Sequence, residues 1–139
     1  MSEYTSFESR VIPLKATEAD VYNFASDIRN FGRFLPGGSV SELKISETNC
    51  SFNVPSIGSV VVELIDKNPN DKILFKATLF GSNEFFLTFR IDGREESRAS
   101  AHIDIKAKLN PVLKMMVDDP IKRFLNLLAD EMENFTDWK

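Results

Sequence analysis

The sequence predicts an α+β fold in which a curved antiparallel sheet of about seven strands wraps around one long C-terminal helix, in the element order β-α-α-β6-α. Residues 109–135 carry an apolar stripe of helical period over a polar back, which is typical of a helix packed on a broad surface. Short segments that alternate apolar and polar residues, separated by turn signals, fill most of the chain before it. With 139 residues, one domain over 1–139 is the natural expectation.

The chain begins with a predicted strand over residues 4–14. Its alternation places Phe7, Ser9 and Val11 on one face, and Pro13 restricts the strand to an edge or to its end. Two short helices are predicted next. Thr17 is a good N-cap for the first helix, whose apolar side we expect to include Ala19. The second helix places three apolar residues on one side: Ile28, Phe31 and Phe34.

Six further strands are predicted because each shows period-two alternation between turn residues. They span residues 40–45, 50–54, 59–66, 73–79, 85–92 and 101–109. The fifth of these has the clearest pattern. We expect Phe85, Leu87, Phe89 and Ile91 to face the long helix, and Phe86, Thr88, Arg90 and Asp92 to face away.

The long helix is expected to begin with Asn110 as its cap and Pro111 at its first position. Its apolar stripe changes direction by roughly 100° on passing Pro120, counting about 100° per residue. A proline inside a helix removes a hydrogen bond and clashes with the preceding turn. We therefore predict a break or kink there, with Asp118 or Asp119 capping the longer segment.

A short motif carries a family resemblance. Val21, Phe24 and Asp27, followed by Phe31 and the run Phe34-Leu35-Pro36, match a "V-x-x-F-x-x-D … F-x-x-F-L-P" pattern. Together with the element order, this resembles the START-like or Bet v 1-like (SRPBCC) superfamily, in particular small bacterial polyketide cyclase/dehydrase-like and coenzyme-Q-binding-like members. The resemblance implies a helix-grip fold with an apolar ligand cavity between sheet and helix. The chain departs from the plant allergen branch, because Ser46–Asn49 contains no glycine-rich loop.

Composition excludes several classes of partner. The net charge is −4 and no dense basic run is present, so nucleic-acid binding is not expected. No apolar run has the length of a membrane span, so we expect no membrane insertion. A single cysteine and the absence of a signal-peptide core at the start favour a cytoplasmic protein. The sequence leaves open whether a protein partner exists.

The sequence offers no evident catalytic set, cofactor motif or metal-ligand spacing. The only histidine, His102, lies on the polar side of its strand, and Cys50 alternates with apolar residues as a buried inert thiol would. Weak candidates for an inward acid or base are Tyr22, Arg10 and Glu42.

Three functions follow from this pattern. The first is binding or carrying of a small hydrophobic molecule, such as a lipid, quinone or polyketide-like ring, without catalysis. The second is a polyketide cyclase/dehydratase-like enzyme, and the third is an interaction module whose cavity is packed shut. For the first, we expect a cavity of about 300–1,000 Å³, the usual range for ligand sites. Its lining is predicted to consist of Phe52, Val62, Phe75, Leu87, Phe89, Ile103, Met116, Phe124 and Leu128.

Overall fold

The computed structural model describes residues 4–34, 41–54, 58–69, 71–79, 83–95, 98–136 and 138, of which 94 and 95 are described by backbone alone. Several turns expected from the sequence lie outside these residues, namely Leu35–Gly38, Pro55–Ile57 and Gly81–Ser82.

The predicted element order is confirmed, with one strand more than expected. The elements are β1 (Thr5–Glu8), β2 (Ile12–Pro13), α1 (Glu18–Ala25), a 3₁₀ helix η1 (Ile28–Phe34), β3 (Ser41–Ile45), β4 (Asn49–Val54), β5 (Gly58–Asn68), β6 (Lys72–Leu79), β7 (Asn83–Glu95), β8 (Arg98–Ala107) and α2 (Pro111–Asn134).

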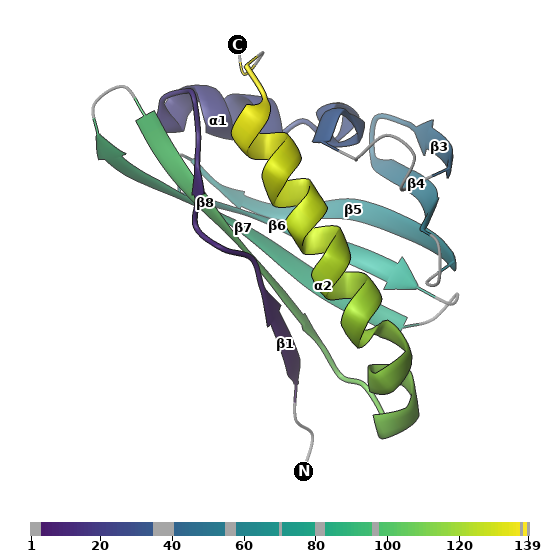
Figure 1. Ribbon diagram of the computed structural model, residues 1–139. Helices are drawn as coiled ribbons and strands as arrows, with labels where there is room; N and C mark the ends of the chain where they lie inside the picture. The colour runs from purple at the N-terminus through teal and green to yellow at the C-terminus, as the bar shows by residue number, and fades with distance from the viewer. Residues whose placement is uncertain are drawn as a thin grey trace.

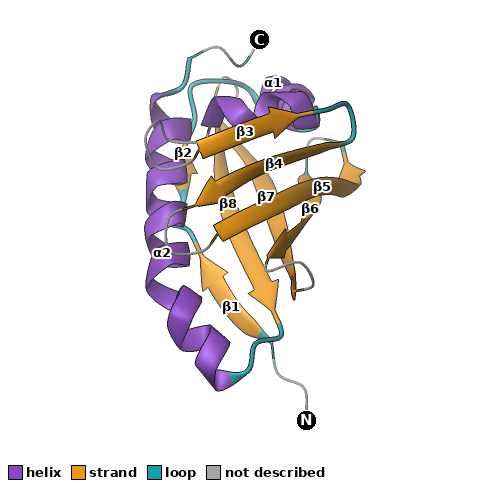
Figure 2. Ribbon diagram, turned by 90° about the vertical axis from the view of Figure 1, so that its right-hand side faces the viewer, coloured by secondary structure: helices purple, strands orange, loops and turns teal. Residues whose placement is uncertain are grey.

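All the strands form one antiparallel sheet in the order β1-β8-β7-β6-β5-β4-β3, and β2 also pairs with β8. The sheet curves around α2, which crosses its concave side, while α1 and η1 close one end (Figures 1 and 2).

The N-terminal strand is divided, which corrects the prediction of one continuous strand. Phe7 and Ser9 are buried, but Val11 is 53% exposed and Ile12 is buried, so the inward phase shifts by one residue. The Ser9 hydroxyl accepts a hydrogen bond from the backbone N–H of Ile103 at 2.9 Å. This side-chain bond replaces a ladder bond and accounts for the interruption between β1 and β2.

The helix start at Thr17 is confirmed, because its hydroxyl accepts a hydrogen bond from the backbone N–H of Asp20 at 3.2 Å. Val21, Tyr22 and Ala25 are buried, whereas Ala19 is exposed and does not belong to the packed side. At about 100° per residue, Ala19 lies about 110° from the centre of the face formed by Val21, Tyr22 and Ala25, so it faces solvent.

The predicted register of β7 is confirmed. Phe85, Leu87, Phe89 and Ile91 are all buried, whereas Arg90 and Asp92 are exposed. The inward side chains of β4, β5, β6 and β8 alternate in the same way, so one face of the sheet forms the core with α2.

The long helix starts as predicted, with the Asn110 carboxamide oxygen accepting from the backbone N–H of Leu113 at 2.8 Å. It then continues through Pro120 without a break, which corrects the expected division. Asp118 does not cap a new segment and instead pairs with Lys122 at 3.0 Å. Figure 2 shows the N-terminal turns tilted against the rest of α2, so the helix accommodates the proline by bending.

Candidate functional site

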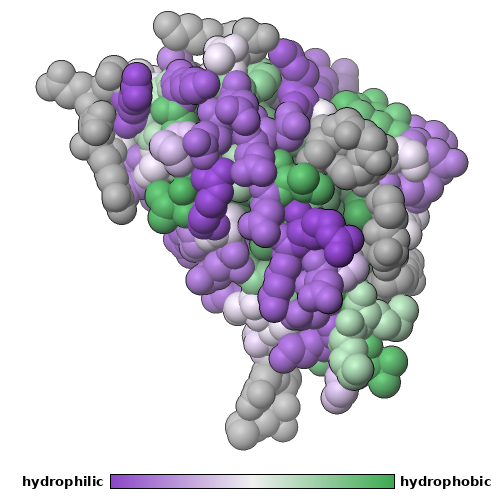
Figure 3. Space-filling model, in the orientation of Figure 1, coloured by the Kyte–Doolittle hydropathy of each residue, from purple (hydrophilic) through white to green (hydrophobic). Residues whose placement is uncertain are grey.

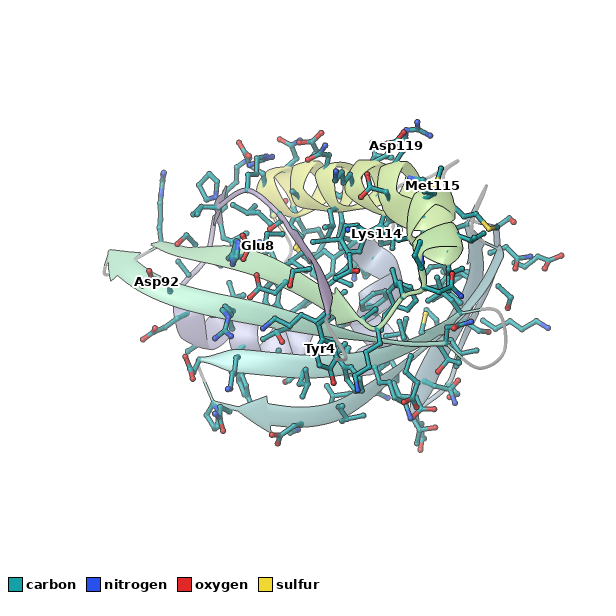
Figure 4. The ribbon with its side chains drawn as sticks, turned by 90° about the horizontal axis from the view of Figure 1, so that it is seen from below. Tyr4, Glu8, Asp92, Lys114, Met115 and Asp119 are labelled. Carbon is teal, nitrogen blue, oxygen red and sulfur yellow. The ribbon has the colours of Figure 1, made fainter. Side chains whose placement is uncertain are left out.

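The contact between α2 and the sheet encloses the candidate site. Six α2 side chains are fully buried there: Val117, Ile121, Leu125, Leu128, Ala129 and Met132. Phe124 is only half-buried and lies at the border of the contact. Viewed from below, side chains fill most of the space between helix and sheet (Figure 4).

A cavity of about 60 Å³ lies under the middle of α2, at Ile121 and Phe124. It extends toward one end of the strands, where β4 and β6 finish and β5 and β7 start. All of its lining residues are apolar: Phe31, Phe52, Val54, Val60, Val62, Ala77, Leu79, Phe85, Leu87, Ile105, Ile121 and Phe124. A lining of this kind excludes water and favours an apolar guest.

Phenylalanine rings explain why this cavity is far smaller than the expected 300–1,000 Å³. Phe52 stacks with Phe31 at 6.2 Å and with Phe124 at 6.3 Å between ring centroids. Phe31 also contacts Phe75 edge to face at 5.7 Å. This row of rings runs from the helix to the sheet and occupies the middle of the gap. The expected volume was therefore wrong for the structure as it stands.

A second aromatic cluster closes the end of the fold near the C-terminus. Phe24, Phe34, Phe135 and Trp138 contact one another with ring centroids 5.1 to 5.7 Å apart. The guanidinium of Arg33 lies 5.3 Å from the centre of the Phe135 ring. Among the described residues, this cluster closes that end of the space between α2 and the sheet.

The structure brings eight of the nine predicted lining residues together in two neighbouring voids. Phe52, Val62, Leu87 and Phe124 line the main cavity. Phe75, Phe89, Ile103 and Leu128 line a void of about 20 Å³ beside it, which Leu87 also borders. Met116 lines neither void and is 54% exposed.

Eight of the lining residues were not predicted as part of the site. Phe85 had been predicted to face inward, but the alternation does not indicate at which end of the sheet a gap remains. Phe31 was assigned to the short helix, whose position over the sheet a strand pattern does not show. The eight are Phe31, Val54, Val60, Ala77, Leu79, Phe85, Ile105 and Ile121.

None of the three candidate acids or bases lines either void. Tyr22 is buried in α1 beside the sheet. Arg10 pairs outside the core with Asp130 at 2.8 Å and with Glu133 at 2.7 Å. Glu42 is exposed and accepts a hydrogen bond from Asn53. The described part of the cavity wall therefore presents no general acid or base to a bound molecule.

Cys50 faces inward from β4 and is fully buried. Burial raises the pKa of its thiol to about 11, so the thiolate is scarce at neutral pH. This agrees with its predicted role as an inert apolar side chain.

Exposed apolar side chains gather at the start of α2. Val112 is 70% exposed and Met115 is 82% exposed. Figure 3 shows this apolar group at the N-terminal end of the helix, and Figure 4 places Met115 and Lys114 on its first turns. Among the described residues, no helix is long and apolar enough to cross a bilayer.

A long helix held by a curved antiparallel sheet, with an apolar gap between them, is the helix-grip architecture. Comparison with solved structures identifies it as the START-like or Bet v 1-like fold. Norcoclaurine synthase from Thalictrum flavum superimposes with a TM-score of 0.71 at 11% identity, covering 95% of this chain and 86% of that chain. A START superfamily protein from Mycobacterium smegmatis gives 0.61 at 13% identity, covering 96% and 99%.

A further similar structure comes from Thermobifida fusca, with a TM-score of 0.62 at 14% identity, covering 91% of this chain and 92% of that one. No family model matches the sequence, and no curated protein matches it. At these identities the likeness establishes the fold and leaves the activity to the site itself.

Proposed function

We propose that the protein binds a small hydrophobic molecule, such as a lipid tail, a quinone or a polyketide-like ring, between α2 and the sheet, and carries it without converting it. The observation that supports this most is the wholly apolar lining of the main cavity. Binding of an apolar guest in such a void is favourable, because the guest leaves water and fills empty space.

The guest must displace the rings that occupy the gap. Phe124 is the natural one to move, because it lies at the border of the helix contact and is half-buried. Pro120 lies one turn before Phe124 in α2. A larger bend of the helix at Pro120 would move Phe124 away from the sheet and open the gap. The proposal therefore includes an opening step, and affinity is reduced by its free-energy cost.

An interaction module with a closed core is the second candidate, and the small cavity volume of about 60 Å³ favours it. A cyclase-type enzyme is less well supported, because the described lining contains no ionisable group. The similarity to norcoclaurine synthase, an enzyme by its name, concerns the fold only. A cytoplasmic location stays a prediction from the sequence.

Titration with an environment-sensitive apolar dye separates the two leading candidates. Leu87→Trp places a larger ring at a position that borders both voids. Phe86→Trp introduces the same ring at the neighbouring position on the outer face and serves as the matched control. Circular dichroism confirms that both variants fold, because overpacking a core costs about 1–3 kcal/mol.

The carrier proposal expects saturable binding by the parent and by Phe86→Trp, and its loss in Leu87→Trp. Phe124→Ala enlarges the cavity and should bind the dye more tightly. Equal binding by all variants, or none by the folded parent and by Phe124→Ala, favours the interaction module.

A further inference from the structure

The outer face of the sheet carries a cluster of possible metal ligands on the side away from the apolar cavity. Glu8 of β1 lies directly opposite Asp104 of β8 in the antiparallel pairing. His102, the only histidine of the chain, lies two residues before Asp104 and so shares its face. Figure 4 shows Glu8 on β1, beside β8.

The three side chains converge closely enough to share one ion. One donor atom from each of Glu8, His102 and Asp104 lies within 4.8 Å of the other two. The His102 Nδ1 atom is 3.4 Å from Asp104 Oδ1. Bonds of about 2.1 Å to a tetrahedral ion place ligand atoms about 3.4 Å apart. The His102–Asp104 separation already matches this spacing, and the exposed Glu8 carboxylate lies within 4.8 Å of both.

Asp104 provides an independent sign that a ligand belongs here. Its side chain is only 14% exposed. Its Oδ2 atom accepts a hydrogen bond from Arg90 Nε at 3.0 Å. Its Oδ1 atom, which faces the cluster, is buried and accepts no hydrogen bond from any described residue. A buried carboxylate oxygen is normally satisfied, so an atom without a donor calls for a water or an ion.

We propose that Glu8, His102 and Asp104 bind a divalent transition-metal ion, with Zn²⁺ as the best match. An imidazole with two carboxylates is a donor set for zinc, whereas calcium and magnesium prefer oxygen atoms alone. The two carboxylates supply two negative charges and Arg90 offsets one of them, so the cluster attracts a cation. Three protein ligands leave the fourth position of a tetrahedral ion to water.

The ion would join β1 to β8. β1 is a four-residue strand at the edge of the sheet and pairs with β8. A ligand that binds the folded state alone raises the melting temperature. The proposal is independent of the cavity, because these residues alternate with the inward ones and face the opposite side of the sheet.

The test uses the full chain, freed of metal by a chelator and titrated with ZnCl₂. The ring protons of His102 are the only histidine signals in the proton NMR spectrum, so they report on this site directly. Calorimetry gives the stoichiometry. Glu8→Gln removes one ligand and Glu84→Gln makes the same change at an exposed carboxylate on β7, outside the cluster. Both variants retain His102 as the reporter.

We expect one saturable equivalent of Zn²⁺, shifted His102 ring signals and a higher melting temperature, all reversed by the chelator. Glu84→Gln should behave as the parent, and Glu8→Gln should bind at least about tenfold more weakly, as removal of a ligand or its support does elsewhere. Two outcomes overturn the proposal. One is unchanged His102 signals at millimolar Zn²⁺. The other is equal binding by Glu8→Gln and the parent, which would mean an adventitious ion on a lone histidine only.

Discussion

Replacing Leu128 by alanine tests whether the centre of α2 is packed as the structure shows. Leu128 is 1% exposed and borders the void of about 20 Å³ beside Phe75 and Ile103. The substitution removes three buried carbon groups, and at about 0.8 kcal/mol each this lowers the unfolding free energy by about 2.4 kcal/mol. A new void of about 50 Å³ at about 24 cal/mol per Å³ adds about 1.2 kcal/mol. The expected loss in unfolding free energy is therefore about 3.5 kcal/mol.

Leu127→Ala is the matched control, since Leu127 is the neighbouring leucine and is 36% exposed. Its loss should stay below about 1 kcal/mol. Urea unfolding followed by the fluorescence of Trp138, the only tryptophan and a buried one, measures both variants. A loss below about 1 kcal/mol for Leu128→Ala, or equal losses for the two, would refute the placement of this helix face on the sheet.

Three further predictions concern separate parts of the chain. Pro120→Ala should stabilise the protein by about 1–3 kcal/mol in urea unfolding, because α2 is continuous there and alanine restores a hydrogen bond; a destabilised variant would show that the bend is required. Cys50 should react with a thiol reagent at neutral pH only after unfolding, because burial raises its pKa to about 11; rapid native labelling would contradict this. The hydrogen bond from Arg29 lowers the pKa of Asp27 in the folded state. The pair therefore stabilises the fold above the pKa that Asp27 has in the unfolded chain, and this stabilisation is lost as the pH falls through the lower pKa of the folded state. A carbon NMR titration in which Asp27 shows an unshifted midpoint would argue against this pair.

The fold was predictable because its signals are local and repeat. The alternation in β7 and β8 gave the inward faces correctly, and Asn110 with Pro111 marked the start of α2. Two local signals misled. Val11 continues the alternation of β1, but the buried Ser9 hydroxyl bonds to β8 and shifts the phase. Pro120 indicates a break, but the helix continues across it.

The sites were less predictable, because each depends on contacts between distant segments. The cavity volume is set by how Phe31 of η1 and Phe124 of α2 meet Phe52 on β4, and no strand pattern contains that geometry. Likewise, Glu8 joins His102 and Asp104 only because β1 pairs with β8. The alternation of β8 already places Asp104 on the same face as His102, and the structure adds Glu8 from β1.

An apolar molecule that enters the space between α2 and the sheet would contact the methyl groups that line it. Methyl NMR of labelled protein titrated with the apolar dye detects such contacts. We expect shifts and dye contacts at the inward methyl groups of Val60, Leu79 and Leu87, which line the cavity. The methyl groups of Ile65, which is 43% exposed, should not respond. Dye contacts confined to exposed residues such as Val112, with the cavity methyl groups unchanged at saturation, would show that the dye binds the surface and not the cavity.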